Sequence, residues 1–257
     1  MNSSPPTVLM ERDGAVLTIR LNRPEALNAL NAATYAGLGV ALIEAASRSV
    51  RAVVLTGSGR AFCPGQDLND AAGDDPAADL RLVDGTVRAL RALQKPTIAA
   101  INGAVAGGGL AYALACDIRI AASSARFAPA FMDLGLVPDL GTSWLLARAM
   151  GAERAFHWLY SGRKVSALEA QAMGLVHEVV EPAALMDRAT VQARALAERA
   201  TLAFGLTKGL LNAATNATFE TQLELEAQAQ AQAGASDDYR EALAAFRERR
   251  PPRFVGH

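Results

Sequence analysis

The stretch Ile101-Asn102-Gly103-Ala104-Val105-Ala106-Gly107-Gly108-Gly109-Leu110 joins two segments of different character. Residues 96–101 are apolar and partly β-branched, which predicts a strand, whereas residues 109–115 predict a short apolar helix. A turn of this kind leaves backbone N–H groups without partners at the start of the helix, where they can point at an anion. The stretch is therefore a candidate anion-binding turn.

A second stretch of similar design, Gly59-Arg60-Ala61-Phe62-Cys63-Pro64-Gly65-Gln66-Asp67-Leu68, follows a predicted strand at residues 51–56. Two such turns that converge would form an oxyanion hole, in which backbone donors stabilise negative charge on a reacting oxygen. The alternative is purely structural, because glycine permits tight turns and close packing without any chemistry. Each stretch taken alone favours this structural alternative.

Strands and helices alternate along the first half of the chain, which predicts an α/β fold. Further strands are predicted at residues 16–21 and 118–121, and helices at 31–46, where Asn31 is the expected N-cap, and at 80–93. From residue 140 onward helices dominate, with one strand at 175–180. The predicted helices there are 140–150, 153–160, 166–173, 183–199, 203–214, 218–233 and 237–247. A shift in composition near residue 200 divides the chain into a core, residues 1–200, and a helical region, residues 201–257.

Composition excludes several classes of protein. With 257 residues, 51% of them hydrophobic, the chain can bury a substantial core, and a net charge of −1 gives no general attraction to nucleic acid or to a membrane surface. Cys63 and Cys116 are too few for a disulfide framework and lack metal-ligand spacing, so we expect no metal. Glycines interrupt the longest apolar stretch, residues 97–117, and residues 1–6 lack the basic start and the apolar run of a secretory leader. We expect a cytoplasmic protein.

Familiar nucleotide and nucleophile motifs are also absent. The third glycine of a dinucleotide-binding G-x-G-x-x-G would fall at Phe62. The segment that begins at Gly141 lacks the closing glycine of a nucleophile elbow, and no P-loop is present. The two glycine-bearing turns remain the best candidates for chemistry.

The chain resembles the enoyl-CoA hydratase/isomerase, or crotonase, superfamily. The resemblance begins near Val8, reaches the C-terminus, and is carried by Asn22-Arg23-Pro24-Glu25-Ala26-Leu27-Asn28-Ala29-Leu30, residues 61–68 and residues 96–117. It implies an α/β spiral of ββα units, similar to ClpP, with a helical C-terminal trimerisation region. It further implies a homotrimer or a dimer of trimers and a coenzyme A (CoA) thioester as substrate, with no separate cofactor.

The resemblance assigns the oxyanion hole to the N–H groups of Gln66 and Gly108. Pro64 has no N–H, but its position does not match a donor, so the hole is preserved. Together with the family motifs, the two turns now favour the oxyanion hole over packing alone. Such a hole would stabilise the enolate formed when a proton is removed beside the thioester carbonyl.

The catalytic carboxylates of the hydratases would fall at Ala111 and Phe131, neither of which can move a proton. Asp139 instead resembles the single carboxylate of isomerases that act on ring-epoxide and enoyl CoA thioesters in phenylacetate breakdown. The segments 221–223 and 236–241 resemble the same branch. We expect apolar neighbours such as Leu136 and Phe131 to raise the pKa of Asp139. The structural alternative for Asp139 is a helix N-cap.

The resemblance also supplies a set of substrate-binding candidates. CoA would lie between Ala26 and the first turn, near Phe62, Asp67 and Leu68, with Lys208 as a candidate contact for its phosphates. Phe131 would line an aromatic acyl pocket, or else serve only the core. Lys208 could equally be a surface lysine of its helix.

Three other functions remain open at this point. One is a plain enoyl-CoA hydratase, and another is a dehalogenase in which Asp139 is the nucleophile, although that enzyme's histidine would fall near Asp84. The third is a non-catalytic or RNA-binding homologue, for which the basic segment 247–253 offers the only support. Such a segment is more often a solvated tail.

Overall fold

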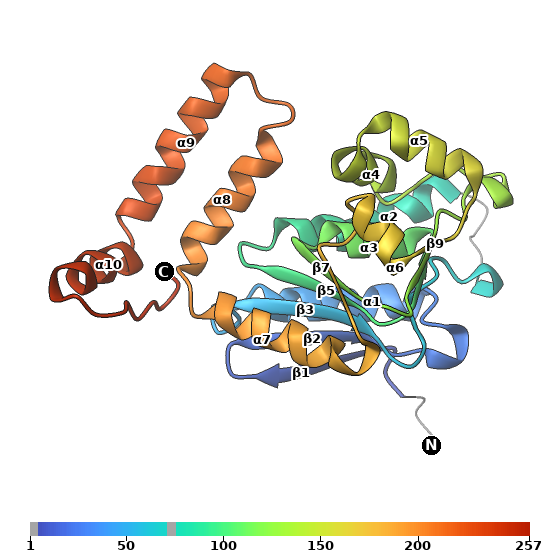
Figure 1. The fold of residues 1–257 in the computed structure, drawn as a ribbon, viewed down its shortest axis with the longest axis horizontal. Helices are drawn as coiled ribbons and strands as arrows, with labels where there is room; N and C mark the ends of the chain where they lie inside the picture. Colours follow the sequence, from blue (N-terminus) through green and yellow to red (C-terminus); the bar gives the residue numbers. More distant parts are fainter. Residues whose placement is uncertain (1–4, 71–75) are drawn as a thin grey trace.

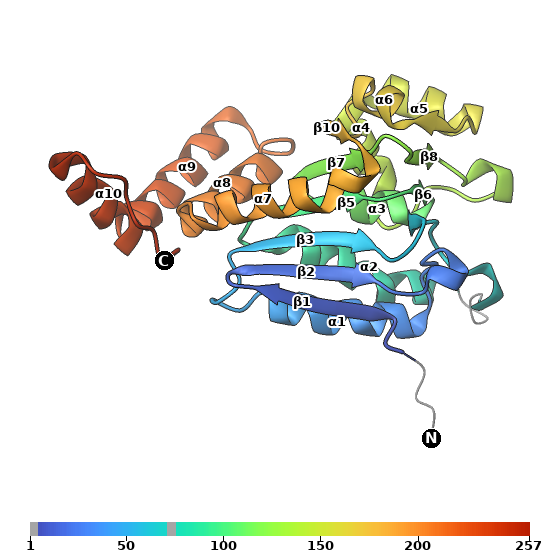
Figure 2. The same cartoon turned by 60° about the horizontal axis from the view of Figure 1, so that its bottom comes forward.

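The computed structural model describes residues 5–70 and 76–257, and its body is built on two β-sheets (Figures 1 and 2). The larger sheet has the strand order β1-β2-β3-β5-β7-β10. Only the β1–β2 pair is antiparallel, and the other neighbours are parallel. Its strands are β1 (Val8–Asp13), β2 (Val16–Leu21), β3 (Ala52–Gly57), β5 (Thr97–Ile101), β7 (Ile118–Ala122) and β10 (Glu178–Val180). The expectation of an α/β fold is confirmed.

The smaller sheet consists of short strands in the order β4-β6-β8-β9. These strands are β4 (Ala61–Cys63), β6 (Ala104–Ala106), β8 (Arg126–Ala128) and β9 (Val165–Ser166). Along the chain, each of β3, β5 and β7 is followed by a strand of this second sheet and then by a helix, which is the expected spiral of ββα units. The short strands and β1 were not predicted individually, because two or three residues carry no periodic pattern and β1 has one buried residue among six.

Helices cover both faces of the larger sheet (Figure 2). On one side lie α1 (Ala32–Ala45), α2 (Pro76–Ala92) and α3 (Gly108–Ala115), and on the other lies α7 (Leu185–Ala197). Successive strand residues point to opposite faces, so Val53 joins the first apolar core and Val54 joins the second, beneath α7. This packing fixes the direction of α3, the helix whose start carries the glycine-rich turn.

The predicted helices are present, with boundaries shifted by a few residues. Asn31 caps α1 as expected, because its side chain accepts a hydrogen bond from Thr34 N at 3.0 Å. The later α-helices are α4 (Thr142–Met150), α5 (Ala152–Ser161), α6 (Ala167–Ala172), α8 (Thr201–Ala213), α9 (Phe219–Gly234) and α10 (Asp237–Glu248). Short 3-10 turns are η1 (Pro24–Ala26), η2 (Leu68–Asp70), η3 (Met132–Leu134) and η4 (Pro182–Ala184).

The last helices, α8 to α10, extend away from the body (Figure 1). Their role in assembly, and the division of the chain after residue 200, remain predictions. Among the described residues, no helix is both long and apolar enough to cross a membrane. Residues 1–4, part of the stretch on which the expected lack of a leader rests, lie outside the described part of the chain.

Candidate active site

The first glycine-bearing turn is held against the end of η1 and the start of α1 by backbone hydrogen bonds. Leu30 N donates to Gly65 O at 2.8 Å, and Asp67 N donates to Leu30 O at 2.9 Å. These bonds form a parallel bridge between Leu30 and Gln66 and leave the Gln66 N–H on the opposite side. Gly65 has φ +102°, a conformation that L side chains rarely adopt. Glycine is therefore required for the turn that presents the Gln66 amide.

The second turn lies directly against the first. A Cβ added to Gly65 would lie 2.9 Å from Gly108 N, and one added to Gly109 would lie 2.1 Å from Cys63 O. Gly107 has φ +48° and precedes the first residue of α3, Gly108. The backbones of the two turns are therefore in direct contact. This is the convergence that a shared oxyanion hole requires.

Both predicted donor amides are without protein partners in the described part of the chain. Neither Gln66 N–H nor Gly108 N–H has a hydrogen-bond acceptor among residues 5–70 and 76–257. The Gly108 N–H belongs to the first turn of α3, where such groups have no partner within the helix and the helix dipole favours negative charge. The arrangement is chemically suited to bind an oxyanion.

Asp139 lies in the segment before α4, beside this turn. Its neighbour Leu140, buried and with φ +50°, places its Cδ1 atom 3.1 Å from the position of a Cβ on Gly108. The segment that contains Asp139 therefore packs against the start of α3. The N-cap of α4 is Gly141, so the alternative of Asp139 as the cap is wrong, although Asp139 O accepts a hydrogen bond from Thr142 N at 2.7 Å.

The Asp139 carboxylate has an incomplete set of partners. Its Oδ1 atom is buried and has no hydrogen-bond partner among the described residues. Burial raises the pKa of Asp139, and the charge of Asp84 raises it further, against the opposing effect of its own backbone N–H. Phe131 is buried as expected, but Leu136 is 53% exposed and forms no buried wall around the carboxylate.

Sequence reasoning missed three polar groups near Asp139. Tyr35, on α1, donates its hydroxyl hydrogen to Gln66 Oε1 at 2.8 Å, and the Tyr112 hydroxyl on α3 shares a hydrogen bond with Thr86. Burial raises the pKa of both tyrosines, and the charge of Asp139 contributes to both shifts. Asp84 acts on Tyr112 as well as on Asp139. Its 4.0 Å contact with Arg88 is a weak one, because Arg88 is 81% exposed.

The candidates for CoA binding fall into two groups. Ala26, at the end of η1, is half-buried and Leu68 is 59% exposed, so both can meet a ligand. The Phe62 ring is fully buried in the core, and Asp67 is held by Arg23 at 2.9 Å, which lowers the pKa of Asp67. The side chains of Phe62 and Asp67 therefore serve packing and loop geometry, and a contact of this segment with CoA stays a prediction.

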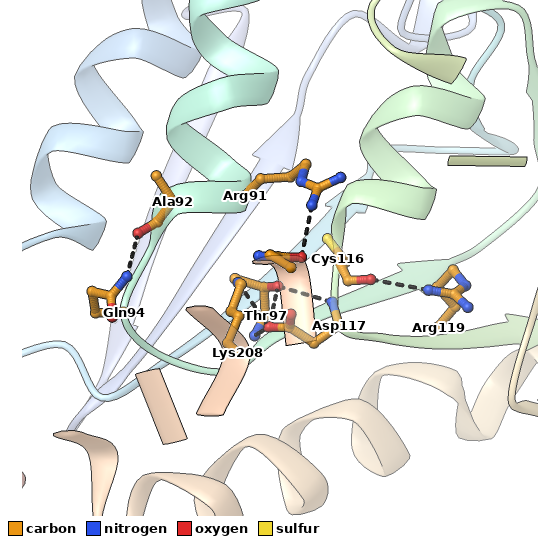
Figure 3. Close-up of polar contacts among 9 residues, drawn as sticks. Arg91, Ala92, Gln94, Thr97, Cys116, Asp117, Arg119 and Lys208 are labelled. Carbon is orange, nitrogen blue, oxygen red and sulfur yellow. Dashed lines mark hydrogen bonds and ion pairs between the residues drawn. The ribbon is translucent and has the colours of Figure 1, made fainter. Parts of the chain in front are cut away.

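Lys208 has a different partner from the one expected. Its ammonium group is buried and lies 3.0 Å from Asp117 Oδ2, at the far end of α3 (Figure 3). The same oxygen accepts hydrogen bonds from Thr97 N at 2.9 Å and from Thr97 Oγ1 at 2.8 Å. Lys208 therefore joins α8 to the sheet, and a contact of Lys208 with CoA phosphates stays a prediction.

Metal-binding groups and a reactive cysteine are two further possibilities for chemistry near this site. No group of three or more His, Cys, Asp or Glu side chains that could hold a metal is found among them. Burial raises the pKa of the Cys63 thiol to about 12, so this cysteine, next to the first turn, stays protonated and is not a nucleophile.

Comparisons with known proteins agree with this geometry. The family model for enoyl-CoA hydratase/isomerase matches residues 11–257. The chain is 44% identical to the 1,2-epoxyphenylacetyl-CoA isomerase of Escherichia coli strain K12, over 97% of this chain and 98% of that protein. It is 36% identical to the short-chain-enoyl-CoA hydratase of Clostridium acetobutylicum, over 95% of each protein.

Solved structures lead to the same family. The enoyl-CoA hydratase of Bacillus anthracis superposes with a TM-score of 0.92 at 34% identity, covering 98% of this chain and 100% of that one. An enoyl-CoA hydratase from Geobacillus kaustophilus gives a TM-score of 0.91 at 36% identity, covering 98% of each chain. Coverage of nearly the whole chain in every comparison leaves one conclusion: this chain belongs to the enoyl-CoA hydratase/isomerase family.

Proposed function

We propose that the chain is an isomerase of CoA thioesters that works through an enolate, with Asp139 as its base. The observation that carries the proposal is the buried Asp139 Oδ1, in a segment that packs against the turn of the Gly108 amide. Among the described residues, neither this oxygen nor the amides of Gln66 and Gly108 have a hydrogen-bond partner. By the family resemblance, Ala111 and Phe131 stand where the hydratases carry their two carboxylates. Neither side chain can activate a water molecule, so the pair that hydratases use for adding water is missing at these positions. The similarity to an epoxyphenylacetyl-CoA isomerase supports an epoxide or enoyl substrate.

In the proposed reaction, Asp139 removes a proton from the carbon beside the thioester carbonyl. The electron pair moves to the carbonyl oxygen, which accepts hydrogen bonds from Gln66 N–H and Gly108 N–H. Each such donor contributes about 3–4 kcal/mol to transition-state stabilisation. The protonated Asp139 then returns the proton further along the conjugated system, so the enzyme is restored and the double bond has moved. With a ring epoxide, the carbon–carbon bond shared by the epoxide and the six-membered ring breaks while both carbon–oxygen bonds stay, which gives a seven-membered oxepin. Removal of the proton beside the thioester carbonyl and its return to a ring carbon then shift the double bonds without any change in mass.

The raised pKa of Asp139 suits this role. A carboxylate with an ordinary pKa is a weak base, whereas one that is less stable as the anion takes a proton more readily. The same group can return the proton, since its acid form is favoured by burial.

Hydration is the second candidate function. Several relatives are named as hydratases, and Asp84 supplies a second carboxylate whose charge acts on Asp139. A pair of carboxylates could divide the work of activating water and delivering a proton.

A panel of CoA thioesters distinguishes the two functions. Crotonyl-CoA, 3-hexenoyl-CoA and 2-(1,2-epoxy-1,2-dihydrophenyl)acetyl-CoA would be incubated with the enzyme and the products separated by chromatography and mass. Isomerase function predicts rearranged products of unchanged mass from the last two and little gain of water by the first. Asp139→Asn should lower turnover at least about 100-fold while substrate still binds. Hydration of crotonyl-CoA as the fastest reaction would replace the proposal with the second candidate.

We also propose that the chain assembles as a trimer, or as two trimers, through α8 to α10. Among the described residues, α9 buries none of its side chains, and Leu211, Phe219, Leu223 and Phe246 are exposed on these helices. Exposed apolar groups in this number are typical of a subunit contact. Sedimentation should give a mass of three or six chains, and a stable monomer would contradict the assembly.

A further inference from the structure

A cavity of about 340 Å³ lies at the end of α3 opposite the candidate active site. Its walls come from the C-terminal ends of α2 and α3 and from residues along α4 and α8. Trp144, Phe204 and Leu211 give it an apolar lining, and Arg91, Arg119 and Arg148 add guanidinium groups. None of these residues takes part in the proposed reaction.

Two of the arginines share one aromatic ring. The guanidinium carbon of Arg91 lies 4.3 Å from the centroid of the Trp144 ring, and that of Arg148 lies 4.5 Å from it. Arg91 also donates to Asn212 Oδ1 at 2.7 Å, and Arg148 donates to Leu211 O at 3.1 Å. The tryptophan and α8 therefore hold two positive charges in fixed places beside the cavity.

Among the described residues, no carboxylate balances the charges of Arg91 and Arg148. In the described part of the chain, neither Arg91 nor Arg148 forms an ion pair. The one acidic residue of the lining, Asp117, is bonded to Lys208 and Thr97. Burial and the charge of Arg148 lower the pKa of Arg91, more than Asp117 raises it. A bound anion would relieve this repulsion.

Arg119 is the third arginine in the lining of the cavity. Its Nη1 donates to Cys116 O at 3.0 Å (Figure 3). Its Nε donates to Leu175 O at 2.6 Å, so the guanidinium group is held by carbonyl groups. With Lys208 neutralised by Asp117, the lining keeps the charges of three arginines. Planar guanidinium groups match a carboxylate through paired hydrogen bonds, and the aromatic lining suits an apolar body.

We propose that this cavity is a second ligand site, which binds a small carboxylate with an aromatic or aliphatic body. The carboxylate lies between Arg91 and Arg148, and the apolar part packs against Phe204 and Leu211. Because α8 forms one wall, an occupied cavity also fixes α8 to the body. The site is separate from the thioester site, and its existence does not depend on the isomerase proposal.

The test uses the full chain and phenylacetate as the probe, with uncharged phenylacetamide of nearly the same shape as its comparison. The chain has two tryptophans, so NMR of the indole N–H groups reads the cavity through Trp144 and uses the buried Trp158 as an internal reference. Phenylacetate should shift the Trp144 signal and leave that of Trp158 in place. It should bind about tenfold or more tightly than the amide.

Two variants locate the contact. Arg148→Gln should weaken phenylacetate binding about tenfold or more, whereas Arg154→Gln, which removes the same charge from the exposed face of α5, should change it less than about twofold. Arg148→Lys keeps the charge without the planar group and should give an intermediate loss, which maintains the test if Arg148→Gln does not fold. Inorganic phosphate serves as an anion without an apolar body and should bind more weakly than phenylacetate.

Several outcomes would overturn the proposal. These are equal binding of acid and amide, phosphate binding as tightly as phenylacetate, equal effects of Arg148→Gln and Arg154→Gln, and no shift of the Trp144 signal at millimolar phenylacetate. A shift of the Trp144 signal that disappears in the Arg148 variants would support it.

Discussion

The two ends of helix α3 are built in opposite ways. At its start, Gly107, Gly108 and Gly109 bring bare backbone against the first turn, and the predicted donor amide of Gly108 has no partner in the described part of the chain. At its end, Asp117 is bonded by Thr97 and by the buried Lys208 of α8. One end leaves hydrogen-bond donors free for a ligand, and the other gives one oxygen of its carboxylate, Asp117 Oδ2, three protein donors.

The start of α3 therefore serves the proposed reaction, whereas its end serves the stability of the fold. Free amides and positive-φ glycines cost folding free energy, since they add flexibility to the unfolded chain and leave donors without partners. The ion pair and hydrogen bonds at the far end hold the helix against the sheet and tie down α8. Substitutions at the start should therefore remove activity from a folded protein, and substitutions at the end should remove stability.

The largest effect is expected for Gly65→Ala. The new methyl group would lie 2.9 Å from Gly108 N, in a conformation with φ +102° that alanine tolerates poorly. Separating the two amides should lower kcat/KM by about 100- to 1000-fold, the effect of losing one oxyanion donor. Gly39→Ala is the matched control, because a Cβ there meets nothing within 4 Å. Activity within tenfold of wild type in folded Gly65→Ala would count against the hole.

Lys208→Met tests the other end of the helix. It leaves the half-buried Asp117 carboxylate without its cation, which should lower the free energy of unfolding by about 1–3 kcal/mol. Urea denaturation would measure the loss. Lys164→Met, on an exposed position without an ion pair in the described part of the chain, should have almost no effect. Equal stabilities of the two variants would show that the Lys208 pair does not anchor α8.

Asp84→Asn refines the description of the catalytic end. Asp84 raises the pKa of Asp139, so its neutral replacement should lower that pKa and move the acidic limb of the kcat/KM profile to lower pH. The shift should be smaller at high salt. Asp187→Asn removes the same charge from the exposed surface of α7 and should leave the profile in place. A profile that is unchanged by Asp84→Asn would mean that the two carboxylates do not interact.

Asp139→Asn should also stabilise the fold at neutral pH. Burial raises the folded-state pKa of Asp139 above its unfolded value, so the carboxyl favours folding below the unfolded pKa and loses this contribution as pH rises through the folded pKa. The asparagine variant has no such loss. Thermal unfolding at pH 7 and near pH 4 should show a gain for the variant that shrinks in acid, and a gain that is the same at both pH values would contradict the linkage.

Much of this arrangement was predictable from the sequence, and the exceptions have physical reasons. The strand, turn and helix around Gly108 follow from local pattern, and Asn31 was recognisable as a cap from its place before an amphipathic run. The approach of Asp84 to Asp139 does not follow from the local pattern, because it depends on how α2 packs against α3, and only the comparison with the dehalogenases pointed to Asp84. Lys208 was equally ambiguous, since a lone lysine on a helix carries no sign of the aspartate that it will meet.

Exchange of the proton beside the thioester carbonyl is the most direct test of the proposed chemistry. Butyryl-CoA, which has no double bond to move, would be incubated with the enzyme in D₂O and followed by proton NMR. The proposal predicts loss of the signal from the carbon next to the carbonyl, at a rate that falls at least about 100-fold in Asp139→Asn. Equally fast exchange in that variant would show that another group removes the proton.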